Sequence, residues 1–256
     1  MSSFTFKQFA ISQDRCAMKV GTDGVLLGAW ARVAHCRRVL DIGTGTGLVA
    51  LMAAQRSQAH IVAIDLDADA VAQATANVAA SPWPARIQVM EVDAREIDHS
   101  DVSIQNSEST HPEANSEFRI HNSEFLFDAI LCNPPFFENA LKSPDAARTM
   151  ARHTDTLSFD ELARSAARLL SPEGELSVII PYDRAHDMTV SAACQGLFAT
   201  RQTIVIPVEG GKPKRMLMAF SREGQSHRVE TLCIHDAQRC PTADYVSLVS
   251  DFYLKM

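Results

Sequence analysis

The chain has 256 residues, of which 46% are hydrophobic and 21% are charged. This composition suits one generous α/β domain or two small ones. No apolar run approaches the ~20 residues that cross a bilayer, and the N-terminal residues lack the basic and apolar regions of a secretory signal. The six cysteines have no Cys-x-x-Cys spacing, which argues against a disulfide framework or a zinc site and predicts reduced thiols in a cytoplasmic protein.

The negative charge is concentrated in one segment. The net charge is −7, yet residues 96–125 hold seven acids and one base, which leaves about −1 for the other 226 residues. A nearly neutral body can present a basic face, so a nucleic-acid partner is not excluded. Residues 97–125 are rich in Ser, Asn and Glu without a helix or strand period, and we predict a disordered insertion there.

Helical and strand patterns alternate along the rest of the chain. The predicted elements in chain order are a helix over 23–33, a strand over 38–42, a helix over 46–56, a strand over 60–65, a helix over 67–79, strands over 87–92 and 127–132, a helix over 158–170, a turn at 172–174, a strand over 175–180, a helix over 184–196, strands over 201–207 and 215–220, and a closing helix over 242–254. This alternation predicts an α/β fold with a mostly parallel sheet and helices on both faces.

A glycine-rich turn follows the first predicted strand. Asp41 is followed by Gly43, Gly45 and Gly47, and a helix begins there. A strand, glycines and a helix form the context in which backbone approaches a nucleotide closely. The dinucleotide fingerprint Gly-x-Gly-x-x-Gly needs its third glycine one residue later, where Leu48 stands, so pyrophosphate binding is disfavoured.

Two acids end the next two strands. Asp65 is placed to accept hydrogen bonds from both hydroxyls of an adenosine ribose. Taken alone, an acid there is more often the N-cap of the following helix, but together with the glycine turn the ligand role is favoured. Asp93, beside Ala94, is placed to accept from an adenine amino group, and a cap is again the alternative.

The sequence Asn133-Pro134-Pro135-Phe136 follows the fourth strand directly. The prolines remove two backbone donors and fix the chain, so the Asn133 side-chain oxygen and the Pro134 carbonyl form two neighbouring acceptors. Two such acceptors can hold both hydrogens of an exocyclic amine, and Phe136 offers a stacking face for a planar base. A polyproline bend beside a core phenylalanine is the alternative for this motif taken alone.

Together these motifs resemble the class I S-adenosylmethionine-dependent methyltransferases that act on amino groups. The order DIGTGTG, IDLD, VDA and NPPFF carries this resemblance. The opening stretch FTFKQFAISQDRCAMKVGTDGVLLGAWA is similar to that of the bacterial tRNA1(Val) (adenine(37)-N6)-methyltransferase family. Relatives often have tyrosine where this chain has Phe136, which keeps the ring and loses the hydroxyl.

The resemblance implies a Rossmann-like single domain over 37–256, with 1–36 as a helical extension that closes over the cofactor. The implied cofactor is S-adenosylmethionine. Its implied contacts are Lys19, Thr22, Asp23, Asp41, Gly43, Gly45, Gly47, Asp65, Asp93 and Asn133. Asn133, Pro134, Pro135 and Phe136 form the implied catalytic motif. Thr22 or Asp23 also suits a simple helix N-cap.

The implied reaction is methyl transfer to N6 of adenine 37 in the anticodon loop of tRNA1(Val). Guanine N2 of ribosomal RNA or a protein glutamine remains an alternative substrate, because the same acceptor chemistry serves them. A nicotinamide oxidoreductase and a non-catalytic RNA-binding module are more distant alternatives. We predict RNA contacts from two basic groups, which are Lys212, Lys214 and Arg215, and Arg148, Arg152 and His153.

Overall fold

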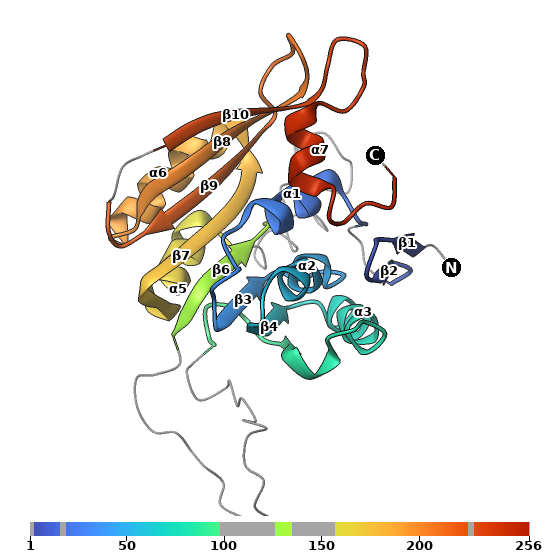
Figure 1. The fold of residues 1–256 in the computed structure, drawn as a ribbon. Coiled ribbons are helices and arrows are strands. Elements are labelled where there is room, and N and C mark those ends of the chain that lie inside the picture. Colours follow the sequence, from blue (N-terminus) through green and yellow to red (C-terminus); the bar gives the residue numbers. More distant parts are fainter. Residues whose placement is uncertain (1–2, 16–18, 98–125, 135–156, 225–227, 256) are drawn as a thin grey trace, which may run out of the picture.

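The centre of the computed structural model is an eight-stranded sheet (Figure 1). The structure describes residues 3–15, 19–97, 126–134, 157–224 and 228–255. In spatial order the strands are β10 (Arg228–His235), β8 (Phe198–Val208), β9 (Arg215–Ser221), β7 (Leu170–Pro181), β6 (Phe127–Cys132), β3 (Arg38–Ile42), β4 (His60–Asp65) and β5 (Ile87–Glu91).

Most neighbouring strands in this sheet are parallel. Strands β7, β6, β3, β4 and β5 run in one direction, and β10 is parallel to β8. Strand β9 runs antiparallel to both of its neighbours, β7 and β8. The predicted mostly parallel sheet is therefore confirmed.

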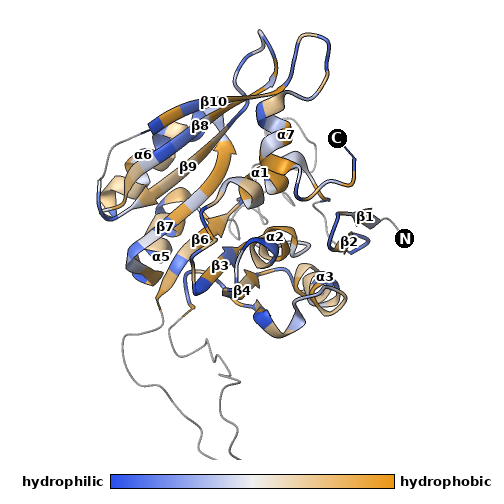
Figure 2. Ribbon diagram, viewed as in Figure 1, coloured by the Kyte–Doolittle hydropathy of each residue, from blue (hydrophilic) through white to orange (hydrophobic). Residues whose placement is uncertain are grey.

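Helices cover both faces of the sheet, as predicted. One face carries α1 (Thr22–Trp30), α2 (Leu48–Arg56), α3 (Ala68–Ala79) and α7 (Ala243–Val249), and the other carries α5 (Phe159–Leu169) and α6 (Ala185–Cys194). Successive strand residues alternate between the two cores, since Val39 packs with α1 and α2 whereas Leu40 packs with α5. Hydrophobic residues accordingly fill much of β6, β7 and α2 (Figure 2). Short 3-10 helices span Pro84–Arg86 and Tyr182–Arg184.

A two-stranded hairpin that was not predicted precedes α1. It consists of β1 (Ser3–Thr5) and β2 (Ala10–Ser12). Aromatic side chains attach it to the main body, because Phe6 stacks on Phe9 and lies 5.8 Å from the ring of Tyr253. The strands are only three residues long, too short to produce a recognisable alternation.

Two predicted boundaries near β7 and α7 were wrong. The turn predicted at 172–174 lies inside β7, at a register irregularity opposite Phe127. Gly174 permits this, because a Cβ there would lie 2.8 Å from the Phe127 carbonyl oxygen. The closing helix stops at Val249 instead of continuing to 254, since the chain then turns to bury Phe252.

The structure also adds an unpredicted edge strand, β10. Its first four residues are exposed, so the sequence carries no clear alternation there. No helix among the described residues is long and apolar enough to cross a membrane. The predicted insertion, apart from Ile97, and Pro135, Phe136, Arg148, Arg152 and His153 lie outside the described residues.

Candidate active site

Four adjacent strands bring the predicted site residues to one edge of the sheet. In the strand register Ile42 lies beside both Cys132 and Ile64, and Asp65 lies beside Glu91. Asn133, Gly43, Asp65 and Asp93 therefore follow one another along the carboxyl ends of β6, β3, β4 and β5. With strands ~4.8 Å apart, this row spans about 14 Å, enough for an extended small molecule.

The glycine turn leaves an open surface at the centre of this row. Gly43 and Gly45 have positive φ angles of 70° and 55°, and a Cβ built on either meets no atom within 4 Å. Gly47, at φ 81°, is the N-cap of α2, and its Cβ would lie 3.4 Å from that of Ala74. Gly47 thus allows helix packing, whereas Gly43 and Gly45 face free space where a ligand can approach.

Asp41 stabilises the glycine turn from the protein interior. Its side chain is buried, and its Oδ2 accepts hydrogen bonds from the Thr44 hydroxyl at 2.6 Å and the Ala50 backbone N–H at 3.1 Å. Burial raises the pKa of Asp41 to about 7, against the lowering effect of those two hydrogen bonds. Because the buried Asp41 side chain bonds Thr44 in the turn and Ala50 in the helix that follows, it holds the shape of the turn.

Asp65 is not the N-cap of the following helix. Asp67 has that role and accepts from the Asp69 backbone N–H at 2.9 Å. Asp65 instead accepts from the Gly45 N–H at 2.8 Å and from the Asp67 N–H at 3.0 Å, one on each carboxylate oxygen. Each oxygen keeps acceptor capacity for a further donor such as a ribose hydroxyl.

Asp93 lies at the end of the row in an ion pair with Arg95. The Arg95 hydrogen bonds lower the pKa of the Asp93 carboxyl, so it stays ionised. The Asp93 side chain is only 11% exposed.

At the other end, Asn133 is half-buried directly after β6 and Pro134 is buried. Burial of the preceding Cys132 raises the pKa of its thiol, which disfavours the thiolate that a nucleophile requires.

The N-terminal segment runs beside the glycine turn. The Asn77 side chain on α3 bonds the backbone of Ser12 at both its N–H and C=O, and it also donates to the Thr46 carbonyl at 2.8 Å. The Gln73 side chain similarly accepts from the Arg15 N–H. Sequence reasoning missed both side chains, although polar residues four apart on the buried face of a helix were a detectable signal.

The residues that precede α1 have different environments. Lys19 and Thr22 are exposed, and Asp23 pairs with Arg215 at 2.7 Å. The alternative interpretation of Thr22 or Asp23 as a helix cap is wrong, because Gly21 is the N-cap and no side chain caps this helix.

Lys212 and Lys214 lie in the β8–β9 connection and are exposed. Since Arg215 pairs with Pro181 at the end of β7, this connection lies at the same sheet edge as the site.

Leu66 is a further residue that sequence reasoning missed. It follows Asp65 at the strand end and is 47% exposed, so an apolar side chain borders the predicted site. An apolar residue between two aspartates was its signal in the sequence.

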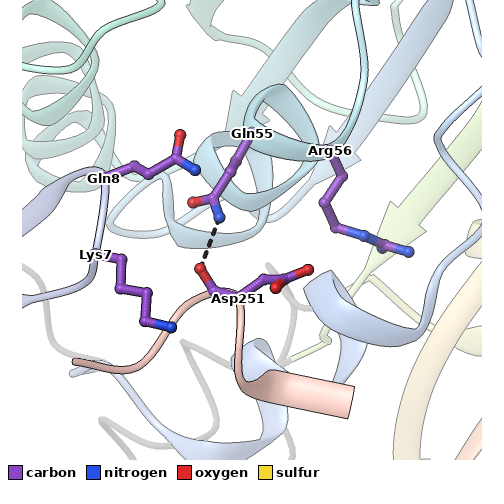
Figure 3. A pocket seen from close by; sticks show the side chains of 5 residues that line it. All are labelled: Lys7, Gln8, Gln55, Arg56 and Asp251. Carbon is purple, nitrogen blue, oxygen red and sulfur yellow. Dashed lines mark hydrogen bonds between the residues drawn. The ribbon is translucent and has the colours of Figure 1, made fainter. Parts of the chain in front are cut away.

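A separate open depression of ≈570 Å³ is lined by the turn of the N-terminal hairpin, the end of α2 and the segment after α7 (Figure 3). Its lining residues are Lys7, Gln8, Gln55, Arg56 and Asp251. Gln55 Nε2 donates to the Asp251 carbonyl and Lys7 to that of Ser250, whereas the Gln55 Oε1 is buried and has no hydrogen-bond partner among the described residues. No predicted site residue contributes to it.

Comparisons with known proteins identify the family. A tRNA1(Val) (adenine(37)-N6)-methyltransferase of Phocaeicola vulgatus is 48% identical over 99% of this chain and 98% of its own. A protein of the same name from Trichodesmium erythraeum is 43% identical over 99% of this chain and 98% of its own. One from Haemophilus influenzae is 41% identical over the full length of both chains. The chain belongs to this family.

The family profile described as a methyltransferase domain matches residues 39–106, which include the glycine turn, Asp65 and Asp93. A predicted O-methyltransferase from Agrobacterium tumefaciens shares the fold, with a TM-score of 0.62 at 19% identity over 90% of this chain and 96% of its own. The oxidoreductase and the non-catalytic RNA-binding module are thereby set aside.

The cofactor of this methyltransferase is S-adenosylmethionine, and the site residues fit it. The open surface over Gly43 and Gly45 leaves room for the methionine part, and the carboxylates of Asp65 and Asp93 lie at the same edge, where they can accept hydrogen bonds from hydroxyl or amino groups.

Proposed function

We propose that this enzyme transfers the methyl group of S-adenosylmethionine to N6 of adenine 37 in the anticodon loop of tRNA1(Val), in the cytoplasm. Two kinds of observation support this proposal. Near-full-length relatives carry this activity in their names, and Asn133 follows β6 beside the glycine turn, where a methyl donor and an amine must meet. The placement of Asn133 is the observation on which the chemistry depends.

In the proposed reaction, the bound cofactor supplies an electrophilic sulfonium methyl group. The Asn133 Oδ1 and the Pro134 carbonyl accept the two hydrogens of the adenine amine. Withdrawing those hydrogens from the ring plane makes the nitrogen lone pair less delocalised and directs it toward the methyl group. The surplus proton leaves to water afterwards, so the residues contribute by positioning and desolvation, without a strong base.

The proposed roles at the cofactor follow the order of the strands. Gly43 and Gly45 contact the methionine part, and Gly47 contributes by letting α2 and α3 pack closely behind the turn. Asp65 binds the ribose and Asp93 the adenine amino group. Asp41 acts indirectly by holding the turn. Lys19, Thr22 and Asp23 belong to the N-terminal segment that we propose closes over the cofactor.

An adenine must leave its stack to reach this edge, which costs least in a single-stranded loop. Lys212 and Lys214, which are exposed at the same edge, are the proposed phosphate contacts among the described residues, with Arg215 beside them. Arg148, Arg152 and His153 are proposed for the same role, and Phe136 for stacking on the base.

The test is methylation of an unmodified tRNA1(Val) transcript, followed by mass spectrometry of its nucleosides. N6-methyladenosine is expected from the natural transcript and not from one with guanine at position 37. Methylation of guanine N2 in ribosomal RNA, or of a protein glutamine, with no product on the tRNA would overturn the proposal. Loss of N6-methyladenosine from the tRNA of a deletion strain provides the matching result in cells.

A further inference from the structure

The guanidinium and the backbone N–H of Arg95 both donate hydrogen bonds to the carboxylate of Asp93. Its Nε donates to Oδ1 at 3.0 Å and to Oδ2 at 2.8 Å, its Nη2 donates to Oδ2, and its backbone N–H donates to Oδ1 at 2.8 Å. A planar guanidinium bonded at two donors fixes the orientation of a carboxylate more firmly than a single contact does.

These hydrogen bonds leave acceptor capacity on the Asp93 carboxylate for a ligand. An ionised carboxylate offers about four lone-pair positions on its two oxygens. Three donors of Arg95, its Nε, its Nη2 and its backbone N–H, already bond to the Asp93 carboxylate, so about one acceptor position remains and it has a defined direction. Without the Arg95 side chain, Oδ1 would keep only its bond from the backbone N–H of residue 95, and the direction of Oδ2 would be less well fixed.

The other end of the Arg95 guanidinium is anchored on α5. Its Nη1 donates to Glu161 Oε1 at 3.1 Å. Glu161 is itself fixed, because its Oε2 accepts from the Ser158 N–H at 2.8 Å while the Ser158 hydroxyl caps the helix, a complete capping box. The start of α5 therefore holds Arg95, and Arg95 holds Asp93.

A second arginine, on α5, binds the backbone of the segment that carries Asp93 and Arg95. Arg168 donates to the carbonyl oxygens of Ile97, Ala94 and Arg95. The backbone that carries Asp93 and Arg95 is thus anchored independently of the Arg95 side chain. A change confined to that side chain should leave the backbone in place, which makes the side chain's role testable.

We propose that Arg95 is a positioning residue that gives the cofactor site its selectivity for a 6-amino purine, by aiming the Asp93 carboxylate at the amino group. This rests on the proposed role of Asp93 toward adenine. A correctly aimed carboxylate accepts from a 6-amino group and repels the oxygen of a 6-oxo purine. Glu161 supports the same arrangement from α5.

The test compares two probes that differ at this position, S-adenosylhomocysteine and its 6-oxo counterpart S-inosylhomocysteine, by calorimetry. The unaltered enzyme should bind the amino form more tightly. Arg95→Gln should weaken the amino form about five- to tenfold and leave the oxo form nearly unchanged, so that the preference shrinks. Glu161→Gln, which keeps a residue suited to the capping box, should shift the preference in the same direction by about two- to threefold.

Arg228→Gln is the matched control, since it removes another arginine from an ion pair, with Glu230 at the far edge strand. It should change neither affinity. Equal weakening of both probes by Arg95→Gln, or no change in either, would overturn the positioning role. Failure of the unaltered enzyme to bind S-adenosylhomocysteine would instead contradict the proposed function itself.

Discussion

The two halves of the central sheet differ in what their strand ends carry. In the half formed by β6, β3, β4 and β5, every strand is parallel and each ends at a polar residue or glycine of the proposed site. In the half formed by β7, β9, β8 and β10, strand β9 runs antiparallel to both of its neighbours, and the same edge carries a connection with two exposed lysines. In the proposed function, the first half binds the cofactor and the second half presents positive charge to the tRNA.

This division separates the expected consequences of substitution. Changes in the first half should alter folding of the turn, chemistry or cofactor affinity. Changes in the second half should alter tRNA affinity alone. The ion pair between Asp23 and Arg215 is the exception, because it joins the N-terminal segment to the start of β9.

The largest effect is expected at Asp41, through the pH dependence of stability. Its carboxyl is buried with a pKa raised to about 7, whereas the unfolded chain ionises near 3.8. Between these values only the unfolded state loses the proton, so the native state loses stability as pH rises from about 4 to 7. Asp41→Asn keeps an acceptor for Thr44 and Ala50 but cannot ionise.

The free energy of unfolding of Asp41→Asn should therefore rise relative to the unaltered enzyme by roughly 2–4 kcal/mol over that pH range, and level off above it. Urea unfolding at a series of pH values measures this. A difference between the two proteins that is the same at pH 4 and pH 8 would show that Asp41 is ionised in the native state throughout.

Asn133→Ala tests the chemical end of the same half. Removing one of two acceptors from the target amine should lower the turnover number by about 10²-fold or more. The affinity for S-adenosylhomocysteine should change by less than about threefold, since the ribose and adenine contacts remain. Single-turnover methylation at saturating tRNA is the measurement, and a near-normal rate would remove Asn133 from the proposed mechanism.

Asp65 and Asp67 form a matched pair for cofactor binding. Asp65→Ala should weaken binding of S-adenosylhomocysteine about tenfold or more, because it removes the proposed ribose acceptor and the partner of the Gly45 N–H. Asp67→Ala removes only the cap of α3, so it should cost about 1 kcal/mol of stability with little change in affinity. Calorimetry and thermal melting distinguish the two, and equal affinities for both variants would contradict the ribose role of Asp65.

Much of the first half could be predicted from the sequence, for a physical reason. Strands β3, β4 and β6 are buried on both faces, so they form continuous apolar runs that end sharply at Gly43, Asp65 and Asn133. Strand β10 is exposed over its first half and gives no such pattern. Apolar runs in the sequence therefore predict buried strands well and exposed edge strands poorly.

Contacts between segments far apart in the chain could not be predicted from the sequence. The pairing of Arg215 with Asp23 joins residues 192 positions apart, and that of Arg95 with Glu161 joins residues 66 apart. The sequence placed Arg215 in a basic cluster with Lys212 and Lys214, but only the fold reveals its acidic partner. Long-range pairing depends on the sheet order, which local patterns do not contain.

The smallest effect is expected at the β8–β9 connection, where Lys212 and Lys214 are exposed. Replacing both with alanine, and keeping Arg215, removes the charge that binds up to two phosphates without breaking the ion pair to Asp23. The affinity for tRNA should fall several-fold, and the slope of log affinity against log salt should flatten by about 0.7–0.9 for each phosphate that is no longer neutralised. The affinity for S-adenosylhomocysteine should not change.

Two further variants complete this experiment. Lys255→Ala removes an exposed lysine near the C-terminus, away from the site, and should leave the salt slope unchanged. Arg215→Ala should weaken tRNA binding and also loosen the N-terminal segment, because Asp23 loses its partner at 2.7 Å, so cofactor affinity falls as well. Filter binding across a salt series measures each slope. If the double lysine variant keeps the original slope and affinity, the second half of the sheet does not contact the tRNA backbone through this connection, and its charge has another purpose.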